Sequence, residues 1–127
     1  MRKSVIAVLA FAANAATAHA QSIDAGENSF KKCVVCHSIG EGATNKVGPA
    51  LNGLDGRRSG TIEGYSYTDA NKNAEIVWSE ITFKEYIQDP RAKIPGTKMF
   101  FPGVKNEKEI ADLWAYLAQF KADGKTK

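Results

Sequence analysis

The most informative segment of this 127-residue chain is Cys33-Val34-Val35-Cys36-His37, a C-x-x-C-H sequence. Two thiols at this spacing can each add to one of the two vinyl groups of a single porphyrin. The histidine that follows is then held beneath the ring, where its imidazole can bind iron. The spacing therefore predicts one covalently attached haem c, with Cys33 and Cys36 forming the thioethers and His37 binding the metal.

The first twenty residues have the composition of an export signal. Two basic residues, Arg2 and Lys3, precede an apolar run of nine residues at 5–13, and residues 18–20 (AHA) form a small-x-small cleavage site. A membrane span needs about 20 apolar residues, so this run is too short for a permanent anchor. We therefore expect residues 1–20 to be a cleaved signal peptide and residues 21–127 to form one exported domain.

Removal of residues 1–20 leaves few side chains that could bind a soft metal. His37 is then the one histidine, Met99 is the one methionine, and no cysteine exists beyond the C-x-x-C pair. A zinc site would need two further ligands, and a thioredoxin-like enzyme would need alternating strands and helices around the motif. A lone disulfide remains an alternative, but the haem interpretation agrees better with the export signal and with the loops described below.

The remaining charges argue against nucleic-acid binding. The 15 basic residues left without Arg2 and Lys3 stand against 14 acidic ones, a net charge of +1, and no basic run exceeds two residues.

Apolar residues at helical spacing predict helices near both ends of the domain. Asn106 is a good N-cap for a helix over residues 107–121, and Asp24 can cap a helix that runs through Phe30 to about Cys33.

Two more helices are predicted in the second half of the chain. A capping box formed by Thr82 and Glu85 indicates a helix over residues 82–88, which Pro90 would end. A short helical turn is expected over residues 68–72.

Long stretches rich in glycine and proline, at residues 38–66 and 89–105, separate these helices, and no alternating strand pattern is visible. Such long loops are unusual in so small a domain. They make sense if the chain wraps around a large apolar group. The predicted fold is all-α, with about 3–5 helices and long loops wrapped around one haem.

The iron's sixth ligand is open to three interpretations: Met99, a lysine, or an empty position. Met99 lies in a loop bounded by proline and glycine (residues 94–102), not on a helical face. A Met/His pair raises the reduction potential of haem. Iron bound on both sides has no place for a substrate, which favours electron transfer over catalysis.

The sequence resembles the class I c-type cytochromes, especially the bacterial cytochrome c2 group, and is similar to mitochondrial cytochrome c. The resemblance covers essentially all of residues 21–127. The motifs that carry it, in the family's order, are C-x-x-C-H at 33–37, Gly48-Pro49-x-Leu51, Gly56-Arg57, YSYTDANK at 65–72, Trp78 and IPGTKM at 94–99.

The resemblance implies a role for each of several residues. His37 and Met99 would be the axial ligands, and the carbonyl of Pro49 would accept a hydrogen bond from His37. Three residues would hydrogen-bond a haem propionate: Arg57, Tyr67 and Trp78. Three would form a polar network near the methionine: Asn71, Tyr86 and Thr97. Four would lie at or near the crossing of the terminal helices: Gly26, Phe30, Trp114 and Tyr116.

The resemblance also implies a function and a location. The protein would be a monomeric periplasmic carrier, without stable membrane insertion, that moves electrons from a cytochrome bc complex to a terminal oxidase or a photosynthetic reaction centre. Lysines near the haem edge would guide it to acidic docking surfaces: Lys31, Lys32, Lys46, Lys93, Lys98 and Lys105. Acidic residues would lie elsewhere: Glu63, Glu75, Glu80, Glu107, Glu109 and Asp112. A haem enzyme or gas sensor, which needs an open iron, and a thiol–disulfide oxidoreductase are the competing functions.

Overall fold

The structure is a computed structural model that describes residues 7–11 and 21–127, so most of the expected signal peptide lies outside the described residues. The helices are α1 (Ile23–Phe30), α2 (Asp69–Lys72), α3 (Glu80–Ile87), α4 (Pro90–Lys93) and α5 (Glu107–Ala118). Within the described ranges the only β pairing consists of isolated bridges, Arg58 with Val77 and Phe120 with Thr126. The all-α prediction is confirmed.

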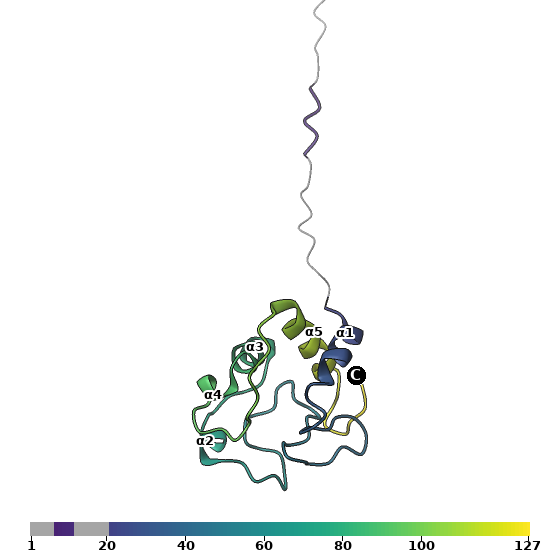
Figure 1. Ribbon diagram of the computed structural model, residues 1–127. Coiled ribbons are helices and arrows are strands. Elements are labelled where there is room, and N and C mark those ends of the chain that lie inside the picture. Colours follow the sequence, from purple (N-terminus) through teal and green to yellow (C-terminus); the bar gives the residue numbers. More distant parts are fainter. Residues whose placement is uncertain (1–6, 12–20) are drawn as a thin grey trace, which may run out of the picture.

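Helix α1, the first of the domain, crosses α5, the last (Figure 1). A Cβ atom on Gly26 would lie 2.0 Å from the backbone oxygen of Asp112, so a glycine is needed for this close approach. The rings of Phe30 and Tyr116 pack beside it, with centroids 5.4 Å apart. Trp114 instead points toward α3, where its ring lies 5.4 Å from that of Phe83.

Helix α1 begins at a different cap from the one predicted. The Ser22 hydroxyl accepts a hydrogen bond from the Ala25 backbone N–H at 3.1 Å, while Asp24 lies within the first turn. The side chain of Ser22, two residues before Asp24, already accepts from a free N–H group of the first turn, so Asp24 is not needed as a cap. The helix ends at Phe30, and a series of turns then carries Cys33.

Helix α3 also starts earlier than predicted. Its capping box joins Ser79 to Thr82, with the Ser79 N–H donating to Thr82 Oγ1 at 2.8 Å. The predicted box between Thr82 and Glu85 is therefore wrong by one turn. Pro90 follows the end of α3 as expected, but it also begins α4, which the sequence did not predict and which Asp89 caps.

The two remaining predicted helices differ little from the structure. Helix α2 forms with Thr68 as its N-cap. Helix α5 starts after Asn106, as predicted, but ends at Ala118 rather than Lys121.

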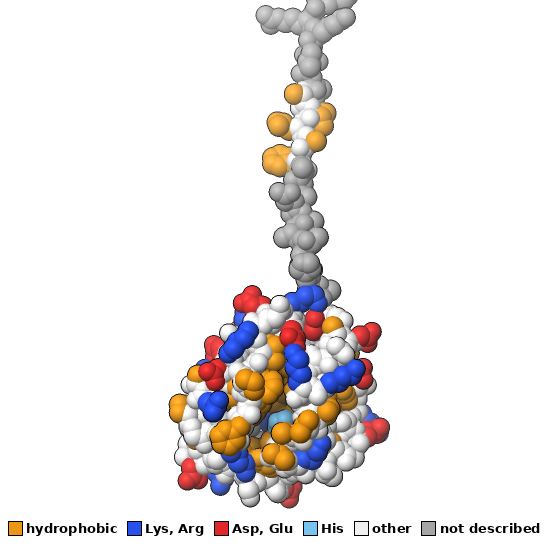
Figure 2. All heavy atoms as spheres, viewed as in Figure 1, with side chains coloured by type: hydrophobic (Ala, Val, Ile, Leu, Met, Phe, Trp, Pro, Cys, Tyr) orange, Lys and Arg blue, Asp and Glu red, His pale blue; other side chains and the backbone are white. Residues whose placement is uncertain are grey.

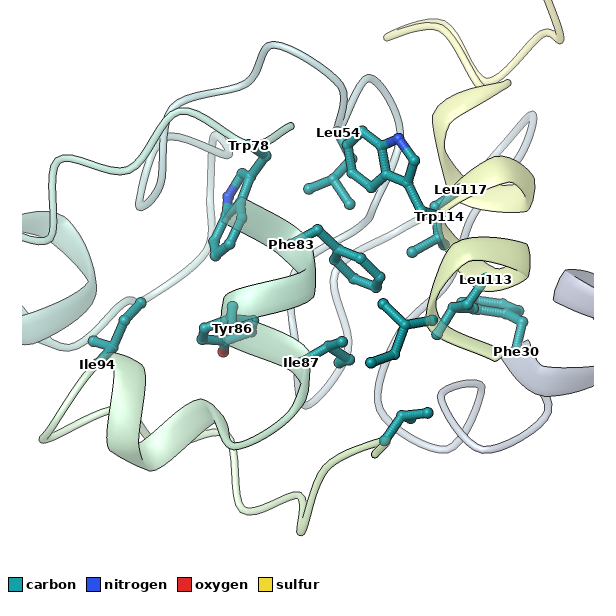
Figure 3. Packing of buried hydrophobic residues seen from close by; sticks show 12 residues of the cluster. Phe30, Leu54, Trp78, Phe83, Tyr86, Ile87, Ile94, Leu113, Trp114 and Leu117 are labelled. Carbon is teal, nitrogen blue, oxygen red and sulfur yellow. The ribbon is translucent and has the colours of Figure 1, made fainter. Parts of the chain in front are cut away.

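The buried hydrophobic cluster lies mainly on the inner faces of α3 and α5 (Figure 3). The edge-to-face pair of Trp78 and Tyr86, with ring centroids 4.9 Å apart, extends this cluster toward the long loops. Helices therefore form one wall of the domain interior, and loops supply the opposite wall.

Candidate functional site

A cavity of about 260 Å³ opens between the helical wall and the loops. Figure 2 shows the hollow, with a histidine side chain visible inside it and hydrophobic side chains around it. The eleven residues that the sequence analysis assigned to the haem and its iron all line this cavity: Cys33, Cys36, His37, Pro49, Arg57, Tyr67, Asn71, Trp78, Tyr86, Thr97 and Met99.

The two thiols lie on the same wall and are not joined in a disulfide. Helical turns after α1 position them: the Cys33 N–H donates to the Phe30 carbonyl at 2.7 Å, and the His37 N–H donates to the Cys33 carbonyl at 2.8 Å. Burial raises the pKa of the Cys33 thiol to about 11. Redox-active C-x-x-C pairs instead contain a thiol with a lowered pKa. Cys33 therefore lacks the lowered pKa of a nucleophilic thiol.

The imidazole of His37 is buried and oriented by backbone contacts. Its Nδ1 lies 2.7 Å from the Pro49 carbonyl oxygen. Because a carbonyl can only accept, Nδ1 must carry the proton, which leaves the lone pair of Nε2 available for a metal. Gly48 packs against the ring, since a Cβ atom there would lie 2.3 Å from His37 Cε1. Burial lowers the pKa of His37, although the bond to Pro49 acts in the opposite direction.

Two hydroxyl groups hold Met99, one through its sulfur and the other through its backbone N–H. The Tyr86 hydroxyl donates to Met99 Sδ at 3.0 Å, and the Met99 N–H donates to Thr97 Oγ1 at 3.2 Å. Burial raises the pKa of Tyr86 to about 12, so its hydroxyl keeps the proton that it donates. Asn71 belongs to a separate contact, because its Oδ1 accepts from the Thr68 hydroxyl at 3.2 Å.

Arg57 supplies a partly buried positive charge to the cavity. Its Nη1 donates to the carbonyl oxygens of Ala50, at 2.9 Å, and Asn52, at 3.1 Å. Its Nε atom is buried without a hydrogen-bond partner. Burial lowers the pKa of this guanidinium, which means that desolvation of the charge is costly. A carboxylate beside Nε would offset that cost.

These observations fit a haem. Two unoxidised thiols, an imidazole with a free lone pair and a thioether line one apolar cavity, and an unpartnered cationic N–H lies in the same lining. A porphyrin with two vinyl groups, an iron and anionic propionates needs all of these groups.

The lining also includes residues to which the sequence analysis gave no role: Leu54, Tyr65, Phe83, Ile87, Phe101, Leu113 and Leu117. Several of these belong to predicted helix faces, but periodicity cannot show that a face borders a cavity. Tyr65 and Phe101 lie in loops, where no periodic signal exists.

Four of the six predicted lysines lie in two places. Lys32 and Lys98 line the cavity, whereas Lys31 and Lys46 line a neighbouring groove beside His37. The other two line neither, because Lys93 forms an ion pair with Glu85 at 2.7 Å and Lys105 donates to the Gln88 carbonyl oxygen. The expectation that Glu109 lies away from the lysines is wrong, because its carboxylate forms an ion pair with Lys32. Helices α1 and α5 cross, and this crossing brings the two charges together.

Comparisons with known proteins agree with this site. A family model described as cytochrome c matches residues 23–121. The chain is 61% identical to a cytochrome c2 of Blastochloris viridis over the whole length of both proteins. It is 66% identical to a cytochrome c2 of Rhodoplanes tepidamans over 107 residues, which are 84% of this chain and all of the relative.

A solved structure gives the same result for the fold. Cytochrome cH from Methylobacterium extorquens matches with a TM-score of 0.71 and 39% identity, over 76% of this chain and 96% of that one. Together with the C-x-x-C-H motif and the cavity, these matches show that the chain belongs to the cytochrome c family and is a mono-haem electron carrier, not an enzyme, with haem c attached at Cys33 and Cys36.

Proposed function

We propose that this protein carries single electrons between membrane redox complexes in the bacterial periplasm, with His37 and Met99 as the two axial ligands of its haem iron. The observation that carries the proposal is that the imidazole and the thioether line the same cavity as the two thiols. The haem supplies an Fe(III)/Fe(II) couple that gains and loses one electron.

The protein's own residues hold this site in one arrangement. Pro49 fixes the orientation of the His37 ring, so that Nε2 stays available to the metal. Tyr86 holds the sulfur of Met99 through its hydroxyl group. Arg57, with Tyr67 and Trp78, provides donors for a propionate that would otherwise be costly to bury.

Ligation from both sides explains why the function is transfer rather than catalysis. A peroxidase or a gas sensor needs an iron position that a substrate can enter. Met99 would occupy that position, held by Tyr86 and by the loop that carries Thr97. With His37 and Met99 held in this way, the residues around the cavity would need little rearrangement during electron transfer.

We infer a cytochrome bc complex as donor and a terminal oxidase or a photosynthetic reaction centre as acceptor, since relatives named cytochrome c2 match over most of the chain. No helix in the described ranges is long and apolar enough to cross a membrane. The Rhodoplanes relative is matched completely by 107 residues, the length that remains after cleavage of residues 1–20.

The proposal is tested by Met99→Ala in the haem-loaded protein. Removal of the thioether should open the iron, lower the reduction potential and let the ferrous protein bind carbon monoxide, which the unaltered protein should not bind. A potentiometric titration with visible spectra measures both effects. Carbon monoxide binding by the unaltered protein, or a variant with unchanged spectrum and potential, would show that Met99 is not a ligand.

The location is tested by the mass of the protein purified from the periplasm. We expect residues 21–127 plus one haem. A chain that retains residues 1–20, or that is found only in the cytoplasm, would contradict this part of the proposal.

A further inference from the structure

We propose that Tyr65 is a positioning residue that ties the loop on the His37 side of the cavity to the loop on the Met99 side. The inference rests on the proposed axial ligands. Tyr65 is partly buried, lines the cavity and lies outside every helix. Its hydroxyl and its ring each contact a different wall.

The hydroxyl of Tyr65 reaches the loop that covers His37. It donates to the Val47 carbonyl oxygen at 2.6 Å. The next residue, Gly48, packs directly against the His37 ring, and its N–H donates to the Cys36 carbonyl at 2.8 Å. The phenol of Tyr65 therefore helps to hold the segment that covers the imidazole.

The ring of Tyr65 contacts the opposite loop. The Lys98 ammonium lies 4.6 Å from the ring centroid, within the range of a cation–π interaction, and it also donates to the carbonyl oxygen of Ser66. Lys98 immediately precedes Met99. The contacts of this ammonium with residues 65 and 66 therefore restrain the backbone that carries the thioether.

A second tyrosine limits how Tyr65 can move. The rings of Tyr65 and Tyr67 meet edge to face, with centroids 4.7 Å apart. The Tyr67 hydroxyl in turn accepts from the Ile62 N–H at 3.1 Å. The two walls can separate only if Tyr65 releases Val47 or Lys98. Separation of the two walls would carry Met99 away from the site of the haem iron, where an outside ligand could then bind.

Imidazole binding to the ferric, haem-loaded protein measures this opening. Tyr65→Phe removes the bond to Val47 and keeps the ring, so we expect imidazole affinity to rise roughly fivefold, the effect of losing one net hydrogen bond. Tyr65→Ala removes both contacts and should raise the affinity further. Tyr116→Phe is the matched control, because it removes a partly buried tyrosine hydroxyl at the α1–α5 crossing, outside the cavity lining.

The outcomes separate this inference from the proposed function. Suppose the unaltered protein shows the weak red band of a thioether–ferric haem and Tyr65→Phe binds imidazole no more tightly. The proposal for Tyr65 is then wrong while the ligand assignment stands. If the unaltered protein lacks that band, Met99 is not a ligand and both ideas are wrong. Equal gains in affinity for Tyr65→Phe and Tyr116→Phe would indicate general loosening, which also overturns the proposal.

Discussion

At the scale of single residues, the contact between Tyr86 and Met99 has the most direct chemical consequence. A hydroxyl that donates to the sulfur at 3.0 Å withdraws electron density from it. As the proposed iron ligand, this thioether would then donate less to ferric iron and make that oxidation state less favoured. Because burial raises the pKa of Tyr86 to about 12, the hydroxyl keeps its proton throughout the physiological range.

We therefore predict that Tyr86→Phe lowers the reduction potential by about 20–60 mV, the equivalent of one net hydrogen bond. A potentiometric titration at neutral pH gives the value. Tyr116→Phe, which removes a hydroxyl outside the cavity lining, should leave the potential unchanged. A rise in potential for Tyr86→Phe would contradict the argument.

At the scale of the elements, the crossing of α1 and α5 depends on Gly26. Any Cβ atom there would lie 2.0 Å from the Asp112 oxygen and 2.8 Å from Tyr116 Cβ, so the helices would have to separate. We predict that Gly26→Ala lowers the free energy of unfolding by about 1–3 kcal/mol. Urea denaturation of the haem-loaded protein tests this. Asn28→Ala, at an exposed position of the same helix, should change the value by less than about 0.5 kcal/mol.

The same crossing contains a buried carboxylate that makes stability depend on pH. Asp112 Oδ1 accepts from the Ser22 N–H at 2.7 Å, and Oδ2 lies 2.7 Å from Lys108 Nζ. The hydrogen bond from Lys108 is the main cause of a lowered pKa of Asp112, and the bond from the Ser22 N–H lowers it further. Because this pKa is lower in the folded protein than in the unfolded chain, the Asp112 carboxylate stabilises the fold at any pH above its unfolded-state pKa of about 4. The stabilisation is lost as the pH falls through the folded-state pKa.

We predict that Asp112→Asn is less stable than the unaltered protein at pH 7 and that the difference shrinks below about pH 4. Denaturation curves at several pH values measure how the free energy of unfolding of each protein changes with pH. Asp24→Asn, an exposed carboxylate of α1, serves as the control and should preserve the acid dependence. A difference that stays constant down to about pH 2 would show that the charge of Asp112 is not the cause.

At the scale of the whole molecule, the arrangement of charge matters more than its sum. The net charge of residues 21–127 is only +1, yet Lys32 and Lys98 lie at the cavity and Lys31 and Lys46 lie beside it. Figure 2 shows basic side chains around the hydrophobic rim of the hollow. Such a face can orient the molecule toward an acidic partner and raise the rate of encounter.

We predict that the double variant Lys31→Glu with Lys98→Glu reacts about tenfold more slowly with an isolated reaction centre or bc complex at low salt. The deficit should shrink at physiological ionic strength, where the Debye length is about 8 Å. Stopped-flow kinetics across a salt series provides the measurement. Lys121→Glu with Lys125→Glu makes the same change of charge in the C-terminal segment. Equal slowing by both pairs, or rates that ignore salt, would exclude steering by this face.

The attachment chemistry and the class of fold could both be predicted from local sequence patterns. Two thiols and an imidazole in five consecutive residues fix the cofactor locally, because no folding is needed to bring them together. Helix α5 was predictable for a similar reason, since its cap at Asn106 and its apolar stripe are contained in the segment itself. The caps of α1 and α3 were misplaced because serine, threonine and aspartate compete for the same role, and local sequence does not rank them.

Contacts between residues far apart in the chain could not be predicted and became visible only in the folded protein. The contact of Tyr86 with Met99, the unpartnered Nε of Arg57 and the bridge that Tyr65 makes between two loops all join segments that share no local pattern. Their geometry depends on loops folding against the helical wall around one cavity. Periodicity carries no information about such contacts, because a loop has no repeating face.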